Sequence, residues 1–383
     1  MSPEPHASDA SGWDVIVVGA GSAGAAVAVQ TARIGLRTLV LDKHPLDRAG
    51  ATWVNGVHGQ AFDEAGLARP TAPELRAAGH RFHLVAGWGP TTKAVSDTGV
   101  LDIDMRLLIA RLQHEARLAG AELRGQESVL ALGPGIVTTA TATLRAALVV
   151  DASGLGGLYR VQKPRPGDVC AAAQGVYAVT DRPAAEAFFR SFGAEPGETL
   201  CFAAVAGGYS IASMRMEGDE LAILTGTLPA LGHPAGKKVR DDLAARHTWI
   251  GPMAFGGHAP IPLHRPRKDL AFGDDDGALV RVGDAAGLVY AAHGSGIGAQ
   301  LVAGRMLADA LSAHGLRPGL RSGLGRAVRA WERAWHRRFG ARFLVADAFR
   351  RLSTRLTPEV LAWVLRSGLM PEPLLRVGFT AGL

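Results

Sequence analysis

Apolar runs alternate with glycine-rich and polar stretches between residues 12 and 42, and this pattern predicts a βαβ unit. Residues 13–18 form a mostly apolar run that leads directly into a glycine-rich turn, and residues 38–41 form a second apolar run. A short apolar run bounded by turn residues is typical of a buried strand in a parallel sheet. The stretch between the two runs is therefore expected to be the connecting helix.

The turn after the first strand carries the pattern G-x-G-x-x-G at Gly19, Gly21 and Gly24, and the second strand ends on Asp42. These glycines permit a tight turn, a close approach of the backbone to a pyrophosphate, and close packing of the helix on the strand. The helix N-terminus presents free N–H groups to phosphate. Asp42 can accept hydrogen bonds from ribose hydroxyls and disfavours a 2′-phosphate, so we predict FAD or NAD rather than NADP.

A second element far downstream favours FAD over NAD. Residues 278–284 form an apolar strand that ends in Gly283–Asp284, and residues 293–300 begin a glycine-rich helix. A simple NAD dehydrogenase has no need of this element, whereas the ribityl chain and isoalloxazine of FAD extend well past the first βαβ unit. We expect Asp284 to hold a ribityl hydroxyl. The helix start should direct its positive end at the flavin N1 and C2 carbonyl region.

Together with residues 149–154, these two motifs resemble the flavoprotein superfamily that contains p-hydroxybenzoate hydroxylase-type monooxygenases, geranylgeranyl reductases, lycopene cyclases and flavin-dependent halogenases. The resemblance covers roughly residues 12 to 315. It implies an α/β fold: an FAD-binding, Rossmann-like lobe of the glutathione reductase type, a mixed-sheet substrate lobe and C-terminal helices. The resemblance is nearest to the geranylgeranyl reductase branch, because Gly287 replaces the histidine of the aromatic hydroxylases. Of that branch's substrate-sheet signature, the chain keeps only Tyr209.

The resemblance also implies which residues hold the cofactor. In this superfamily a helix, expected here over residues 101–123, often begins with an arginine that reaches FAD, and a following strand contacts adenine through its backbone. The arginine position falls on Met105, with Arg106 beside it. The cofactor-binding residues are expected to be Gly19, Gly21, Ser22, Ala23, Gly24, Asp42, Lys43, Arg106, Val129, Asp151, Gly154, Gly283, Asp284, Gly287, Gly294, Gly296, Ile297 and Gly298.

The motifs and the turn residues between the apolar runs divide the chain into three parts. Residues 12–42, 95–160 and 276–316 are expected to assemble a discontinuous FAD-binding domain. Residues 43–94 and 166–275 should form the substrate domain, with a mixed sheet that covers the flavin, and residues 317–383 a helical segment.

Composition indicates a soluble globular enzyme. The 383 residues include 41 basic and 35 acidic side chains, and this small excess does not indicate a nucleic-acid partner. Cys170 and Cys201 lack a metal-ligand spacing and are expected to be buried packing residues, so no metal site is predicted. The polar N-terminus and the absence of a long apolar run predict a cytoplasmic protein.

Arginines concentrate in the C-terminal segment. Residues 326–339 mix aromatic and basic residues at helical spacing, and residues 343–356 continue the pattern. The favoured interpretation is a helical layer that packs its Trp and Leu side chains on the body and leaves arginine to solvent. The alternative is a cationic amphipathic helix in peripheral contact with an anionic membrane or an acidic partner.

The candidate catalytic residues are His293, Asn55, His58 and Tyr209. The substrate wall is expected around Trp53, Val54, Phe202 and Tyr209, which favours a hydrophobic small molecule. A histidine at a helix start should be held toward its neutral form.

We therefore predict an FAD-dependent oxidoreductase that reduces a carbon–carbon double bond. A flavin-dependent monooxygenase and a non-redox, flavin-dependent cyclase or isomerase are the alternatives, and a non-catalytic flavin carrier is the least favoured. Because only one nucleotide fold is evident, electrons would come from NADH or NADPH docking transiently or from a protein donor.

Overall fold

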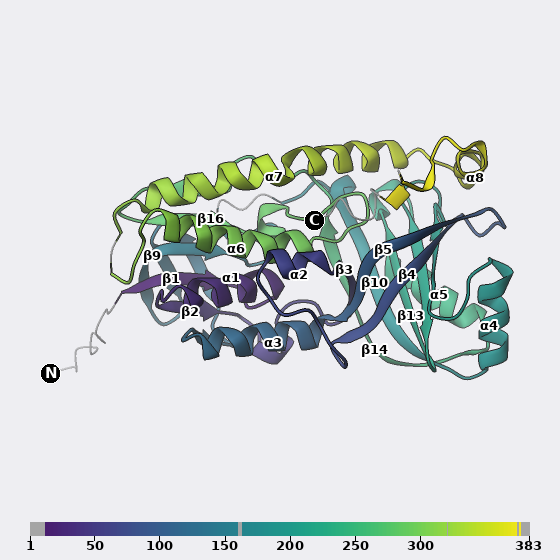
Figure 1. The fold of residues 1–383 in the computed structure, drawn as a ribbon, viewed down its shortest axis with the longest axis horizontal. Coiled ribbons are helices and arrows are strands. Elements are labelled where there is room, and N and C mark those ends of the chain that lie inside the picture. Colours follow the sequence, from purple (N-terminus) through teal and green to yellow (C-terminus); the bar gives the residue numbers. More distant parts are fainter. Residues whose placement is uncertain (1–11, 160–162, 320, 374, 377–383) are drawn as a thin grey trace.

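Two sheets lie side by side and one long helix runs along both (Figure 1). The computed structural model describes residues 12–159, 163–319, 321–373 and 375–376, except the side chain of His80. Residue 160, where the second segment of the FAD-binding domain is expected to end, and residues 377–383 lie outside this description.

The first sheet has the strand order β15-β16-β9-β1-β2-β6. Its five parallel strands end at a common edge, because Val18 at the end of β1 pairs with both Leu41 and Asp151, and Asp151 also pairs with Arg281. The antiparallel strand β15 completes the edge, and a β7–β8 hairpin extends from β9. The bounds are β1 Trp13–Val18, β2 Thr38–Leu41, β6 Glu122–Arg124, β7 Val129–Gly133, β8 Ile136–Thr139, β9 Thr143–Asp151, β15 Ala271–Gly273 and β16 Ala278–Arg281.

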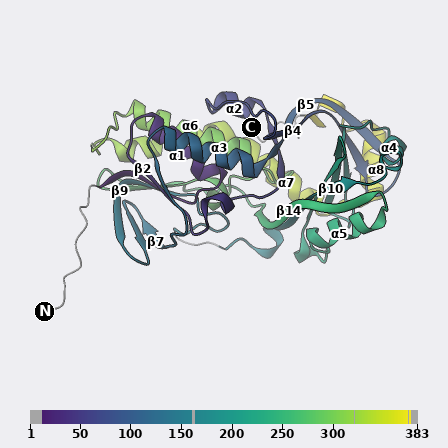
Figure 2. The same cartoon turned by 90° about the horizontal axis from the view of Figure 1, so that it is seen from below.

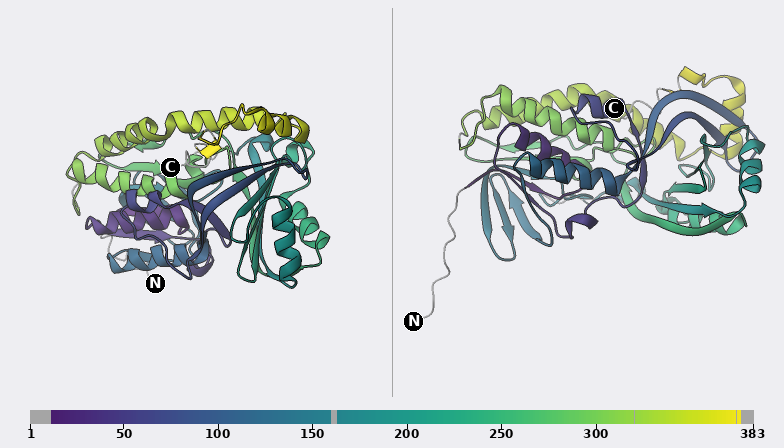
Figure 3. Two further views of the ribbon diagram at one scale, coloured as in Figure 1. Left: turned by 45° about the vertical axis from the view of Figure 1, so that its right-hand side comes forward. Right: turned by 60° about the horizontal axis from the view of Figure 1, so that its bottom comes forward.

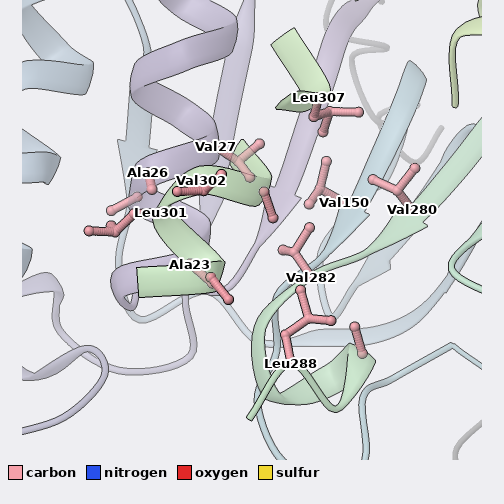
Figure 4. Close-up of a cluster of buried hydrophobic side chains, with 14 of the residues drawn as sticks. Ala23, Ala26, Val27, Val150, Val280, Val282, Leu288, Leu301, Val302 and Leu307 are labelled. Carbon is pink, nitrogen blue, oxygen red and sulfur yellow. The ribbon is translucent and has the colours of Figure 1, made fainter. Parts of the chain in front are cut away.

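Helices cover one face of this sheet and the β7–β8 hairpin covers the other (Figure 2). The helices are α1 (Ser22–Arg33), α3 (Met105–Leu118) and α6 (Ile297–Ala313), with the short α2 (Gln60–Glu64) beside α6. Small residues let α1 and α6 approach closely: a Cβ on Gly304 would lie 3.2 Å from the backbone nitrogen of Val27. Figure 4 shows the resulting cluster, in which Leu301 of α6 lies beside Ala26 of α1.

The second sheet is mixed, as predicted, with the order β14-β10-β13-β12-β11-β4-β5-β3. Only β11 and β4 pair in parallel. Helices α4 (Arg182–Ser191) and α5 (Gly236–Arg246) cover the face remote from the first sheet (Figure 3). The strand bounds are β3 Val54–His58, β4 Leu75–Ala86, β5 Thr92–Asp104, β10 Val169–Val179, β11 Thr199–Ala203, β12 Ile211–Glu217, β13 Glu220–Thr227 and β14 Ile250–Pro262; the 3₁₀ turns are η1 Leu46–Arg48, η2 Pro166–Asp168, η3 Pro229–Leu231 and η4 Gly283–Ala286.

The passage from the second sheet back to the first differs from the sequence expectation. Strand β5 pairs with both β4 and β3, so residues 95–104 lie in the second sheet rather than in the FAD-binding lobe. The helix expected from residue 101 begins at Met105. Asp104 sets this start, because its buried carboxylate accepts a hydrogen bond from the N–H of Arg106 as an N-cap.

The C-terminal segment consists of α7 (Leu324–Ser353) and α8 (Pro358–Ser367). Helix α7 packs on the first lobe through Trp331, Trp335, Phe339 and Phe343, which are fully buried. The packing predicted for the aromatic residues of this helix is therefore present over residues 331–343. Among the described residues, no helix is long and apolar enough to cross a membrane.

Candidate cofactor and active site

The two glycine-rich motifs meet at the carboxyl edge of the first sheet. Gly19 has a φ of 109°, and a Cβ there would lie 2.3 Å from the carbonyl oxygen of Ala152, at the end of β9. Gly283 has a φ of 63°, and a Cβ there would lie 2.8 Å from the Cβ of Ala23. No other residue type fits either position without moving the backbone or α1.

A polar bridge connects the same motifs. The Gln300 side chain of α6 accepts a hydrogen bond from Ser22 Oγ at 3.3 Å and donates one to Asp284 Oδ1 at 3.1 Å. Burial raises the pKa of the Asp284 carboxyl, although the hydrogen bond from Gln300 acts in the opposite direction. Asp284 therefore has a fixed orientation and a free second oxygen with which to accept a hydroxyl.

Two helix N-termini point into this region without side-chain caps. Helix α1 begins after Gly21 and α6 begins after Gly296; neither cap residue has a side chain, and neither first turn carries an acidic residue. The first N–H groups of both helices are therefore left for an external acceptor. A pyrophosphate and a reduced flavin are anionic acceptors of the kind that such termini stabilise.

Asp42 lies where the sequence places it, at the end of β2. Its carboxylate accepts hydrogen bonds from the N–H groups of Ala20 at 2.7 Å and His44 at 2.8 Å, while Lys43 is exposed. The N–H of Glu127 donates to the Asp42 carbonyl at 2.8 Å, which brings the start of β7 at Val129 beside Asp42. These contacts align the segments expected to hold ribose and adenine.

The structure does not bring Arg106 to the glycine-rich loop. Its guanidinium pairs with Asp104 at 2.6 Å and lies 3.7 Å from the ring centre of Phe255, in the second lobe. The α3 residue that reaches the loop is Gln113, whose amide donates to the Ala20 carbonyl at 3.0 Å. Sequence reasoning missed this residue because a buried glutamine in a helix carries no distinctive pattern.

Asp151 organises its own loop. One carboxylate oxygen accepts from the N–H and Oγ of Ser153, and the other accepts from the N–H groups of Leu158 and Tyr159. These hydrogen bonds shape the loop that contains Gly154.

His293 lies in the loop before α6, as expected. Its Nδ1 accepts a hydrogen bond from the Ser295 N–H at 3.3 Å, so the neutral ring carries its proton on Nε2. Burial lowers the pKa of this imidazole to about 4, and the Nε2 atom is buried without a partner among the described residues. The ring packs on Tyr290, with 4.8 Å between ring centres.

Tyr209 approaches the same loop from the second lobe. Its hydroxyl lies 3.9 Å from the position that a Cβ on Gly294 would occupy. Burial raises the pKa of the Tyr209 phenol well above its usual value, so the hydroxyl keeps its proton at neutral pH. The structure therefore brings together two of the four candidate catalytic residues, Tyr209 and His293.

The other two candidates, Asn55 and His58, lie on β3. Asn55 accepts a hydrogen bond from Trp53 Nε1 at 3.2 Å, and β3 reaches the α6 loop because Ser295 Oγ donates to the Gly56 carbonyl. His58 lies at the far end of the strand, where its Nδ1 accepts from the Gln60 N–H. Burial and then the nearby Arg69 lower the pKa of His58.

Two further polar residues face this region and were not found from the sequence. His264 occupies the space beside Gly287, where a Cβ would lie 2.7 Å from His264 Cε1. The glycine at 287 was the available signal, because it makes room for a ring from elsewhere in the chain. Gln174 of β10 accepts from the Val54 N–H at 3.4 Å, and its buried Nε2 has no partner among the described residues.

These features fit FAD. The close approaches at Gly19 and Gly283 build a narrow cradle, two uncapped helix N-termini face it, and two buried donors, His293 Nε2 and Gln174 Nε2, lack acceptors among the described residues. A buried donor without a partner is costly, and the carbonyl and ring nitrogen acceptors of a flavin would satisfy such groups. Among the described residues, no group of three or more His, Cys, Asp or Glu side chains could hold a metal ion.

The substrate wall differs from the expected one at Phe202. Phe202 is fully buried on the remote face of the second sheet, where its ring lies 5.0 Å from Trp88 and 5.1 Å from Phe192. Strand alternation turns its neighbours Cys201 and Ala203 to the face that looks toward the first lobe. This face carries the small or aliphatic side chains Ala172, Cys201, Ile211, Ser213, Ala222 and Leu224 together with the polar Gln174 and Arg215. Burial raises the pKa of both cysteine thiols to about 12, consistent with packing residues.

Comparison with known proteins agrees with this geometry. Residues 14–88 match the family model described as FAD dependent oxidoreductase. A digeranylgeranylglycerophospholipid reductase from Sulfolobus acidocaldarius is 24% identical over 326 residues, which cover 78% of this chain and 69% of that protein.

Solved structures share the fold across the whole chain. A geranylgeranyl bacteriochlorophyll reductase-like protein from Thermoplasma acidophilum has a TM-score of 0.77 at 16% identity and covers 95% of this chain and 97% of its own. PqsL from Pseudomonas aeruginosa is described as a "probable FAD-dependent monooxygenase". It has a TM-score of 0.60 at 17% identity, and the match covers 97% of this chain and 99% of PqsL. The chain has the fold of FAD-binding flavoprotein oxidoreductases.

Replacing Asp284 with alanine is expected to weaken FAD binding by about 10- to 100-fold, because a hydrogen bond to a carboxylate contributes about 1.5–3 kcal/mol. Titration of the apoprotein with FAD, followed by flavin fluorescence, measures the change. Asp309→Ala is the matched control, because Asp309 is an exposed α6 residue paired with Arg305. Equal affinities of the two variants would remove Asp284 from the cofactor site.

His293 should make the protein less stable as the pH falls. The folded ring takes up a proton only near pH 4, whereas in the unfolded chain it does so near pH 6.5. The unfolded state therefore binds more protons between these values, and the free energy of unfolding should drop by about 2 kcal/mol between pH 7 and 4.5. Denaturant unfolding of the FAD-loaded protein at both pH values should show that His293→Gln loses this part of the dependence and the exposed-residue control His44→Gln keeps it. An unchanged pH dependence in His293→Gln would contradict a buried, neutral His293.

Proposed function

We propose that this FAD-dependent oxidoreductase reduces a carbon–carbon double bond in a hydrophobic, isoprenoid-like substrate. The observation that carries the proposal is the position of the Tyr209 hydroxyl. It is a protonated donor in apolar surroundings, where an apolar sheet face meets the loop before α6. Reduction of a double bond requires both a hydride and a proton, and this hydroxyl is suited to provide the proton.

The sheet face supports an extended apolar substrate. Small and aliphatic side chains lie along β10, β13 and β12, and a pocket of about 270 Å³ borders this face near Val54 and Leu75. The same pocket is also lined by charged side chains, which could receive a polar terminus: Arg76, Asp102, Arg215, Glu217 and Glu220. An amphipathic molecule, with a long apolar part and a polar terminus, matches this arrangement.

The relatives support the same substrate class. The Sulfolobus acidocaldarius protein is named for a geranylgeranyl lipid and the Thermoplasma acidophilum protein for geranylgeranyl reduction.

Different site residues would bind the cofactor, donate a hydrogen bond and supply the proton. Asp284, the N-termini of α1 and α6, and the Asp42 strand end would hold FAD, which supplies the hydride when it is bound and reduced. His293 stays neutral and would donate a hydrogen bond from Nε2 to an acceptor of the bound flavin, and Tyr209 would supply the proton to the substrate carbon. We propose that electrons reach the enzyme from NADH or NADPH docking transiently or from a protein donor.

Anaerobic turnover separates this function from the alternatives. With chemically reduced enzyme and a geranylgeranyl phospholipid as the probe, a reductase should form a product two hydrogens heavier without O₂. Product that appears only with O₂ and contains an oxygen atom from it would establish a monooxygenase instead. A product of unchanged oxidation state, formed with catalytic amounts of reductant, would establish the non-redox cyclase or isomerase.

Tyr209→Phe is expected to lower kcat by about 100- to 10,000-fold, the usual contribution of a positioned acid. FAD affinity and the rate of flavin reduction by dithionite should stay at their wild-type values, because the substitution removes only the hydroxyl. Tyr177→Phe is the matched control, since Tyr177 is equally buried but belongs to the core under α4 and α5. Normal turnover in Tyr209→Phe would exclude the phenol as proton donor.

A further inference from the structure

The second half of α7 and helix α8 carry an exposed apolar surface that the fold does not use. Of the fourteen large hydrophobic side chains exposed among the described residues, seven lie between residues 344 and 369. These are Leu344, Val345, Phe349, Leu352, Val360, Trp363 and Leu369, and the most exposed are Leu352 at 67% and Val345 at 64%. An apolar concentration of this kind marks an interaction site.

The α7 members of this group form one continuous face. Leu344, Val345, Phe349 and Leu352 are spaced at i, i+1, i+5 and i+8, so they lie on one side of the helix. The opposite side is occupied by Phe343, Ala346, Arg350 and Ser353, all of which are buried. The second half of α7 therefore has an apolar side that is exposed, whereas the side that packs on the protein mixes apolar, polar and charged residues.

Helix α8 follows α7 at the same end of the molecule (Figure 1). Its Leu361 and Leu365 pack on Leu84 and Ala203 of the second sheet. Its other side exposes Val360 and Trp363, the latter to 57%. We call the exposed apolar residues of 344–369 together the α7–α8 surface.

The charges around the α7–α8 surface are almost all positive. Between residues 333 and 369 the only exposed acidic side chain is Glu359, whereas seven arginines are exposed. The arginines are Arg333, Arg337, Arg338, Arg342, Arg351, Arg355 and Arg366. A second copy of this chain placed face to face would bring like charges together, which disfavours a symmetric dimer.

We propose that the α7–α8 surface docks on an anionic lipid bilayer. Its apolar side chains would enter the boundary between headgroups and acyl chains, the flanking arginines would pair with lipid phosphates, and Trp363 would lie at the interface, where tryptophan is favoured. An apolar surface flanked by arginines is complementary to a bilayer whose headgroups are negatively charged and whose interior is apolar.

Docking in this way would place the substrate side of the enzyme next to the membrane. Helix α8 covers part of the sheet face that looks toward the first lobe, and the Gly208 N–H donates to the Leu356 carbonyl between α7 and α8. The loop that carries Tyr209 is thus attached directly to the docking surface. The docking proposal does not depend on the proposed reaction, because it rests on exposure and charge alone.

Vesicle co-sedimentation of the FAD-loaded protein tests the proposal. Vesicles of phosphatidylcholine with phosphatidylglycerol should bind the wild type at least tenfold more tightly than pure phosphatidylcholine vesicles, and added salt should weaken the binding. Leu352→Glu and Trp363→Glu should each lower the binding at least tenfold. Leu118→Glu is the matched control, because Leu118 is 75% exposed at the end of α3, and it should bind as the wild type does.

Three outcomes would overturn the proposal. The first is a wild type that does not sediment with anionic vesicles. The second is an equal loss of binding in Leu118→Glu and Leu352→Glu, which would indicate non-specific adsorption. The third is a stable dimer in analytical ultracentrifugation that Leu352→Glu converts to a monomer, which would assign the surface to a second copy of the chain.

Discussion

The close approach of α1, η4 and α6 at the carboxyl edge of the first sheet is the constraint on which the site depends. Gly283 abuts Ala23, and Gly304 lets α6 approach the backbone of α1. Because the parallel strands β1, β9 and β16 end in register, this packing brings two helix N-termini and the Asp284 carboxylate to one place. Along the chain, the start of α1 is more than a hundred residues away from Asp284 and from the start of α6. Only the folded sheet brings these parts of the site together.

Helix α7 fixes the second sheet relative to this edge. Residues 331–343 of α7 pack aromatic side chains on the FAD-binding lobe, and residues 347–350 hold the connection between the lobes through ion pairs of the buried Asp347 and Arg350. Arg350 pairs with Asp168 at 2.8 Å and with Asp347 at 3.2 Å, and Asp347 also pairs with Arg265 at 3.0 Å. Removing one member of such a buried network leaves an uncompensated charge, so the lobes are held in one arrangement. That arrangement places Tyr209 beside the loop before α6.

The sequence predicted those features that depend on local pattern. The βαβ unit, Asp42 at the end of β2, the strand before Asp284 and the mixed second sheet each follow from apolar spacing, glycine positions or motif order. It could not show which face of a strand an aromatic residue occupies, so Phe202 was assigned to the substrate wall although it packs under α4. It also could not reveal Gln113 or Gln174, because contacts between distant segments leave no local signal, and for His264 it offered only the glycine at 287. The start of α3 was misplaced because a β-strand and a helix meet there within one apolar stretch.

The two titratable groups at the centre of the site are both neutral at pH 7, and for the same physical reason. Burial disfavours the charged form of each: it lowers the pKa of His293, whose charged form is protonated, and raises the pKa of Tyr209, whose charged form is deprotonated. Each residue therefore presents a hydrogen-bond donor and no net charge. Such a site can receive an apolar molecule without leaving a charge unsolvated.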